Sequence, residues 1–153
     1  MKLATLCYLR RKNKTLMLHR IKKKNDIHDG KWNGLGGKFE EGESPEECAR
    51  REVFEEAGIK INKLRFKGVL TFPEFSKGED WYVFLFVSSD FTGKLKNCVE
   101  GNLKWIEDLK LLKLNLWQGD KIFLKHLNKK GFISGKFKYK NGKLADYKLH
   151  IYK

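Results

Sequence analysis

Three glutamates near the middle of the chain, Glu52, Glu55 and Glu56, have types and spacing that suggest chemistry. On a helix, residues three and four apart share a face, so these side chains would form one acidic patch. Like charges at this spacing repel by roughly 0.2–0.5 kcal/mol per pair. A divalent cation removes that repulsion, and carboxylate oxygens are ligands that Mg²⁺ and Mn²⁺ prefer. The cluster therefore predicts a site for a hard metal ion.

The residues around the cluster predict the helix that must carry it. Ser44 is suited to be the N-cap, Pro45 the first helical residue, and Glu47 the return partner of a capping box. Gly58 stands where a left-handed C-terminal cap belongs. We therefore expect a helix over residues 45–57.

An apolar stripe on this helix predicts how the acidic patch is oriented. Ala49, Val53 and Ala57 recur at helical spacing and should be buried. Glu52 and Glu56 lie beside this stripe, at the edge of the core. Partial burial makes a carboxylate costly unless a cation is present.

The rest of the chain reads as strands with a few helices and no regular strand–helix repeat, which indicates a mixed sheet covered by helices. Loops are expected over residues 21–34 and 73–80, and Asn141-Gly142 is a strong hairpin turn signal. The expected strands are Leu3–Arg10, Thr15–Arg20, Gly68–Phe72, Trp81–Val87, Leu103–Ile106, Lys136–Lys140 and Lys143–Ile151, with a further helix over Asp120–Asn128.

Composition limits the class of protein. The 153 residues, of which 41% are hydrophobic, suit a single folded domain over residues 1–153, and no apolar run is long enough to span a membrane. Cys7, Cys48 and Cys98 match no metal or disulfide framework and are expected to be free thiols in a reducing cytoplasm. The net charge of +14 suits a polyanionic ligand that arrives with a metal ion, with nucleic acid as the other possible partner.

One run of residues resembles the motif of a known family, the Nudix hydrolases. Gly37 is followed at fixed offsets by Glu43, by Arg51-Glu52-Val53, by Glu55-Glu56 and by Gly58-Ile59. A capped acidic helix alone does not explain Gly37, Glu43 and Arg51 at those offsets. The resemblance implies an α/β/α sandwich with a mixed β-sheet. It also implies Mg²⁺-dependent or Mn²⁺-dependent hydrolysis of a nucleoside diphosphate linked to a further group.

The resemblance also implies roles for individual residues. Arg51 would pair with a neighbouring carboxylate and orient it, and Glu43 would have a structural role. Glu100 would be either a metal ligand or the general base that takes a proton from the attacking water; as a sequence feature alone it could be a solvated loop acid. The expected metal ligands are the carbonyl of Gly36 and the carboxylates of Glu52, Glu55, Glu56 and Glu100.

Segments outside the motif are similar to the oxidised-purine triphosphatases within this family. These segments are Lys31–Lys38, Trp117 with Asp120, Gly135–Tyr139 and Asp146-Tyr147. The resemblance implies hydrolysis of 8-oxo-dGTP to the monophosphate and pyrophosphate, which keeps damaged bases out of DNA. The residues expected to bind this substrate are Asn33, Trp117 and Asp120 at the base, Lys23 and Lys38 at the phosphates, and Thr5 and Phe72 as further lining of the base pocket.

Alternatives remain open at this point. Asn33 could be a turn residue, Asp120 a helix N-cap, and Trp117 a core aromatic. Gly119 stands where mammalian relatives have the first of two adjacent acids, which puts oxidised adenine in doubt as a substrate. The substrate could instead be an RNA 5′ end, a dinucleoside polyphosphate or a nucleotide sugar, and a non-catalytic binding module is a third reading. We expect a monomer.

Overall fold

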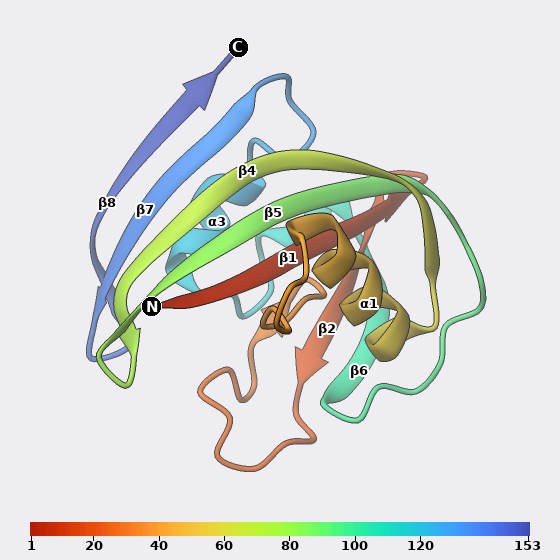
Figure 1. The fold of residues 1–153 in the computed structure, drawn as a ribbon, viewed down its shortest axis with the longest axis horizontal. Coiled ribbons are helices and arrows are strands. Elements are labelled where there is room, and N and C mark those ends of the chain that lie inside the picture. The colour runs from red at the N-terminus through yellow and green to blue at the C-terminus, as the bar shows by residue number, and fades with distance from the viewer.

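The computed structural model describes all 153 residues, which form one mixed eight-stranded sheet between helices (Figure 1). The hydrogen-bonded strand order is β3-β2-β1-β5-β4-β7-β8, and β6 pairs with β2. The strands are β1 (Lys2–Arg11), β2 (Lys14–Arg20), β3 (Trp32–Asn33), β4 (Lys60–Ser76), β5 (Glu79–Thr92), β6 (Gly101–Glu107), β7 (Phe132–Lys140) and β8 (Lys143–Tyr152). The helices are α1 (Pro45–Ala57), α2 (Asp108–Leu111) and α3 (Gln118–Leu124).

Two parallel pairings make the sheet mixed. β1 runs parallel to β5, with Thr5 opposite Phe84, and β4 runs parallel to β7, with Leu70 opposite Gly135. The other pairings are antiparallel. The expected α/β sandwich with a mixed sheet is confirmed.

β1 separates two halves of the hydrophobic core because successive side chains of a strand point to opposite faces. Cys7 and Leu9 pack with Val53 in a cluster beneath α1. Tyr8 packs with Phe123 of α3 in the second cluster. The position of a residue on β1 therefore shows in which half of the core its side chain packs.

Helix α1 begins and ends where its capping residues predict. The Ser44 hydroxyl accepts a hydrogen bond from the Glu47 N–H, and the Glu47 side chain accepts one from the Ser44 N–H, which completes the capping box. Gly58 adopts the left-handed conformation, and its N–H donates to the Phe54 carbonyl. The helix over residues 45–57 is confirmed.

The segment expected to be a loop over residues 73–80 is instead the tip of a long hairpin. β4 continues to Ser76 and pairs with Glu79 of β5, so that only Lys77 and Gly78 form the turn. Pro73 is tolerated because the register shifts between Phe72 and Ser76, and its missing N–H then removes no regular ladder bond.

Other expectations differ in detail. Trp32 and Asn33 form the short strand β3 inside the segment expected to be a loop. The helix expected over Asp120–Asn128 is α3, which begins at Gln118 and ends at Leu124. The strands around Asn141-Gly142 pair as predicted. No helix is both long and apolar enough to cross a membrane.

Candidate active site

The three glutamates of α1 differ in exposure, in the order that the apolar stripe of the helix predicts. Glu56 is 8% exposed and buried at the edge of the core, whereas the Glu55 side chain is 56% exposed. Glu52 lies between these extremes. The patch therefore runs from solvent into the core, with Glu56 at its inner end.

The loop that contains Gly36 and Gly37 lies directly against β1 and α1. A Cβ at Gly36 would lie 2.0 Å from the Thr5 carbonyl oxygen, and one at Gly37 would lie 2.5 Å from the Glu52 carboxyl carbon. The Gly36 N–H donates to Glu56 Oε1 at 2.8 Å. The Gly36 carbonyl oxygen accepts no hydrogen bond from the protein, which leaves an oxygen free beside the acidic patch.

Arg51 holds the outer part of the patch. Its guanidinium donates to Glu43 at 2.6 and 2.9 Å, to Glu52 at 2.7 Å and to Glu55 at 3.2 Å. The hydrogen bond from Arg51 lowers the pKa of Glu43 to about 2, and the same contact raises the pKa of Arg51. Arg51 therefore stays charged and fixes the neighbouring carboxylates, as its position in the motif predicts.

Glu100 is brought to the inner end of the patch from a distant part of the sequence. Its carboxylate lies 3.3 Å from the Arg20 guanidinium, and its backbone carbonyl accepts a hydrogen bond from the Lys22 N–H. Burial, together with the charges of Glu100 and Glu52, raises the pKa of Glu56 to about 8, against the effect of the Gly36 hydrogen bond. The charges of Glu52, Glu56 and Glu100 thus influence one another, and we call these three carboxylates the acidic group.

The donor set of this group fits a hard divalent cation. Glu52, Glu56, Glu100 and the free Gly36 carbonyl offer oxygen atoms, and burial makes the Glu56 carboxylate costly without a cation. The structure contains no set of three acidic, histidine or cysteine side chains already gathered for coordination. Arg51 and the Gly36 N–H instead hold Glu52 and Glu56 separately.

A second region contains buried polar groups that have no hydrogen-bond partner. It begins on the α3 face of β1 and extends beyond that strand. The Nδ2 group of Asn33 and the hydroxyl of Tyr8 are buried without hydrogen-bond partners. Gly34, next to Asn33, leaves no room for a Cβ against the Tyr8 ring. The Asp120 carboxyl is buried, and its charge adds to the effect of burial in raising the pKa of Tyr8. A buried polar group without a partner is costly, so these groups suit a ligand that supplies the missing partners.

Asp120 has an altered titration because of its burial. Desolvation raises the pKa of its carboxyl to about 7, although the charge of Lys31 acts in the opposite direction. Its side chain accepts no hydrogen bond, and it lies within α3 and does not cap it. Near neutral pH, Asp120 can therefore accept a hydrogen bond or donate one.

Trp117 lies in an enclosure of aromatic side chains and is only 8% exposed. Its indole N–H donates to His28 Nδ1 at 2.8 Å, and its ring packs edge-on against Phe75 and Tyr139. The Lys31 ammonium lies over the indole, 5.2 Å from the ring centre. A base that stacked on Trp117 would therefore have to replace Lys31.

Three of these neighbours of Trp117 were not predicted from the sequence. Phe75 was hidden in a segment that looked like a loop, and His28 lies in a polar segment with no periodic pattern. Tyr139 lies within the family-like segment Gly135–Tyr139 and could have been found by that signal.

The structure gives a steric reason for Gly119. Its N–H donates to the Tyr139 hydroxyl at 2.7 Å. A Cβ at this position would lie 2.8 Å from that oxygen and 2.8 Å from Cδ1 of Phe137. An acid at position 119 would therefore require both rings to move.

The remaining candidates are placed differently. Phe72 belongs to the region of Trp117, because its ring lies 5.4 Å from that of Phe75. Thr5 does not, because its hydroxyl contacts Cys48 of α1, on the opposite face of β1 from Tyr8. The Lys38 ammonium lies 5.4 Å from the Trp81 ring centre, whereas Lys23 is exposed in the segment between β2 and β3 with no polar contact.

Comparison with known proteins shows the family and the fold of the chain. Residues 1–127 match the NUDIX domain model. The chain is 33% identical over 129 residues to the oxidized purine nucleoside triphosphate hydrolase of Danio rerio, covering 83% of this chain and 82% of the relative. It is 33% identical over 141 residues to the uncharacterized Nudix hydrolase YvcI of Bacillus subtilis, covering 88% and 85%. The crystal structure of the mutator MutT protein of Bacillus halodurans superposes with a TM-score of 0.85, at 31% identity, covering 97% of each chain.

Proposed function

Because this chain belongs to the Nudix hydrolase family, we propose that it hydrolyses oxidised purine nucleoside triphosphates with Mg²⁺, or with Mn²⁺ in its place. The proposed reaction converts 8-oxo-dGTP into 8-oxo-dGMP and pyrophosphate. The observation that carries the substrate class is a buried amide donor without a hydrogen-bond partner, on Asn33, together with the buried carboxyl of Asp120, in a protein that also contains the Nudix carboxylates. The name of the Danio rerio relative supports the same class.

The acidic group performs the hydrolytic half of the reaction. The cation would be held by Glu52, Glu56, Glu100 and the Gly36 carbonyl, and when bound it would neutralise charge on the phosphate oxygens. One carboxylate of this group takes the proton from the attacking water, and the bond between the α- and β-phosphoryl groups breaks. Arg51 orients Glu52 through the hydrogen bond of 2.7 Å.

The buried polar groups of Asn33 and Asp120 select the base. 8-Oxoguanine differs from guanine in having an N7–H donor and an oxygen on C8. The Asp120 carboxylate can accept from that N–H, whereas the bare N7 of guanine would face it with a second acceptor. A site built to hydrogen-bond a substrate group rejects an analogue without it strongly, because the buried partner is left unpaired. Trp117 supplies the stacking surface once Lys31 moves aside.

The test is to measure hydrolysis of 8-oxo-dGTP and of dGTP with and without Mg²⁺, and to identify the products by mass. We expect the monophosphate and pyrophosphate, with kcat/KM at least about tenfold higher for the oxidised nucleotide, which corresponds to about 1.4 kcal/mol. A preference below tenfold would overturn the substrate assignment but not the family.

A second candidate substrate, a triphosphorylated RNA 5′ end, is favoured by the net charge of +14. Including such RNAs, dinucleoside polyphosphates and nucleotide sugars in the same panel separates these possibilities. Under the proposal favoured here, the enzyme acts as a monomer in the cytoplasm and cleans the nucleotide pool, a role that supports DNA repair.

A further inference from the structure

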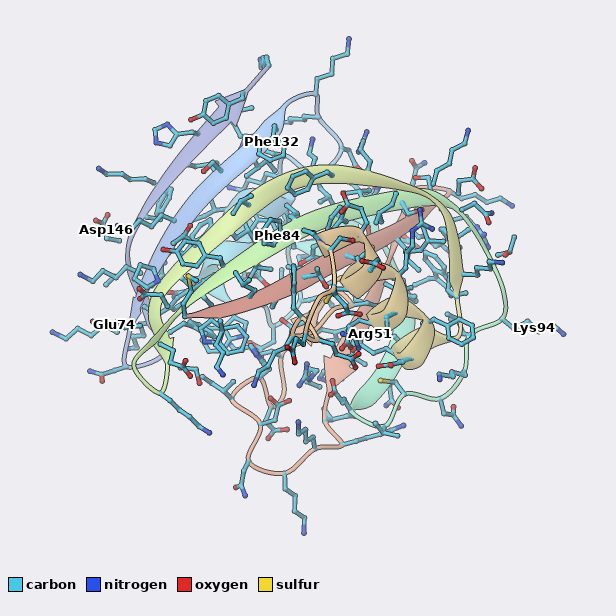
Figure 2. All side chains as sticks on the ribbon, viewed as in Figure 1. Arg51, Glu74, Phe84, Lys94, Phe132 and Asp146 are labelled. Carbon is cyan, nitrogen blue, oxygen red and sulfur yellow. The ribbon has the colours of Figure 1, made fainter.

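The face of the sheet that carries α1 is covered over only part of its width (Figure 1). Helix α1 packs against β1 and β4, whereas the helix that packs against β7 and β8 is α3, on the other face. Figure 2 shows Phe84 on β5 next to α1, and Phe132 on β7, farther from that helix. The outer part of the α1 face is therefore open at β7 and β8.

The strand register shows which side chains occupy this open face. Phe132 lies opposite Tyr152, and Lys136 lies opposite Lys148. These residues alternate along β7 with side chains that belong to the core on the α3 side. We call the surface formed by Phe66, Phe132, Lys136, Lys148 and Tyr152 the open face.

The open face carries aromatic rings that are exposed or partly exposed to solvent. Phe66 is 40% exposed, and its ring lies 5.0 Å from that of Phe132, edge to face. Tyr152 is 60% exposed and lies opposite Phe132 in the register. Contiguous exposed apolar groups bordered by polar ones mark interaction sites.

The charge beside these rings selects the kind of partner. The one acid among the paired residues of β7 and β8 is Asp146, opposite Lys138, whereas Lys136 and Lys148 have no acidic partner. A second copy of this face would bring lysines against lysines. The charge is complementary to a polyanion, and the whole chain carries +14.

We propose that the open face binds single-stranded nucleic acid, with phosphates at Lys136 and Lys148 and unpaired bases on the rings of Tyr152, Phe132 and Phe66. Flat rings on a sheet, with lysines four residues away along the same two strands, accept the bases of a single strand by stacking, whereas a duplex keeps its bases paired. This surface is separate from the base-binding region, because Tyr8 and Asp120 lie on the α3 side of the sheet. It is also separate from the acidic carboxylates of α1, because α1 packs against β1 and β4 and the open face is centred on β7 and β8.

The test uses the complete chain and a short fluorescein-labelled oligonucleotide with a 5′-hydroxyl, in EDTA, so that neither catalysis nor a terminal phosphate contributes. Fluorescence anisotropy then measures binding of the single strand and of its duplex across salt concentrations. The double variant Lys136→Ala/Lys148→Ala should weaken single-strand binding roughly tenfold and reduce the salt slope by about two. The control variant Lys104→Ala/Lys110→Ala removes the same charge from exposed sites elsewhere and should change binding less.

The aromatic part of the proposal has its own variants. Tyr152→Ala should weaken single-strand binding by about tenfold and leave duplex binding unchanged, whereas Tyr152→Phe should retain most of the affinity. The proposal would be overturned if the two lysine double variants lost the same amount of affinity for the single strand. It would also be overturned if duplex and single strand bound equally well whether or not Tyr152 was present. Binding to phosphatidylserine vesicles through the same lysines without oligonucleotide binding would overturn it as well. Nucleotide hydrolysis should be unchanged in all these variants. Absence of hydrolysis in the parent protein would refute the proposed function but would leave the nucleic-acid site untouched.

Discussion

Glu56 combines burial, a hydrogen bond from a backbone amide and two acidic neighbours, which is an arrangement that stabilises the fold poorly without a cation. We expect Glu56→Gln to reduce kcat by a factor on the order of 10³, because the variant loses a charged ligand or base at the reacting group. The same change should leave the melting temperature unchanged or raise it in metal-free buffer. Steady-state kinetics and thermal unfolding measure the two effects.

The matched control for this variant is Glu46→Gln, an exposed glutamate in the first turn of the same helix with no side-chain bond. It removes the same charge and should keep full activity. Equal activity of Glu56→Gln and the parent protein would contradict the assignment of the acidic group and favour a binding module.

Asp120 makes the stability of the fold dependent on pH. Its folded pKa of about 7 lies above the ordinary value of 3.8, so the folded state holds this proton more tightly than the unfolded state. Its contribution to the free energy of unfolding is therefore fully present below about pH 4 and is lost as pH rises through 7. Asp120→Asn does not titrate and should lack this loss.

The measurement is urea unfolding of both proteins at several pH values without metal. The stability of Asp120→Asn relative to the parent should rise between pH 4 and 7 and level off above, with a total change on the order of a few kcal/mol. Other titrating groups occur in both proteins and cancel in the difference. A difference independent of pH would show that Asp120 keeps an ordinary pKa.

At the scale of elements, the segment between β2 and β3 closes over Trp117. Asn115 donates to the Gly30 carbonyl and accepts from the Lys31 ammonium, and His28 accepts from the Trp117 indole. Burial lowers the pKa of His28 to about 4, so its imidazole is neutral and Nδ1 is free to accept. Side-chain hydrogen bonds therefore hold this segment to Trp117 and to Asn115.

We expect His28→Ala to raise KM for the oxidised nucleotide several-fold with a smaller effect on kcat, because Trp117 loses the bond that fixes its ring. His28→Asn, which retains an acceptor, should recover part of the affinity. His126→Ala, a substitution of a histidine in the turn after α3, serves as the control. An unchanged KM in His28→Ala would contradict a positioning role.

Elements with local signals were predictable, and those determined by distant pairing were not. Ser44, Glu47 and Gly58 specify α1 through contacts a few residues apart, so the helix and its acidic face followed from the sequence. The hairpin tip beyond Pro73 depends on pairing between β4 and β5, and a proline suggested a break instead. The lack of space for a side chain at Gly119 is due to Tyr139. Only the packing of α3 against β7 brings Tyr139 close to Gly119.

At the scale of the whole molecule, the net charge of +14 gives a field that would attract the proposed triphosphate substrate. We expect kcat/KM to fall by up to about tenfold as ionic strength rises from well below to above the physiological value, because salt screens this attraction. kcat should change little, since it reports on the bound complex. Steady-state kinetics in a salt series measures both, and kcat/KM independent of salt would show that the overall charge does not guide the substrate.

The three cysteines are buried, and none forms a disulfide. Burial raises the pKa of the Cys7 thiol to about 12 and also raises the pKa values of Cys48 and Cys98. Peroxide attacks the thiolate and spares the protonated thiol, so these side chains resist conversion to sulfenic acid. Cys48 lies beneath the Gly37 carbonyl, where oxidation would displace the loop that borders the carboxylates. The same packing that builds the core thus makes the fold chemically durable under the oxidising conditions in which damaged nucleotides form.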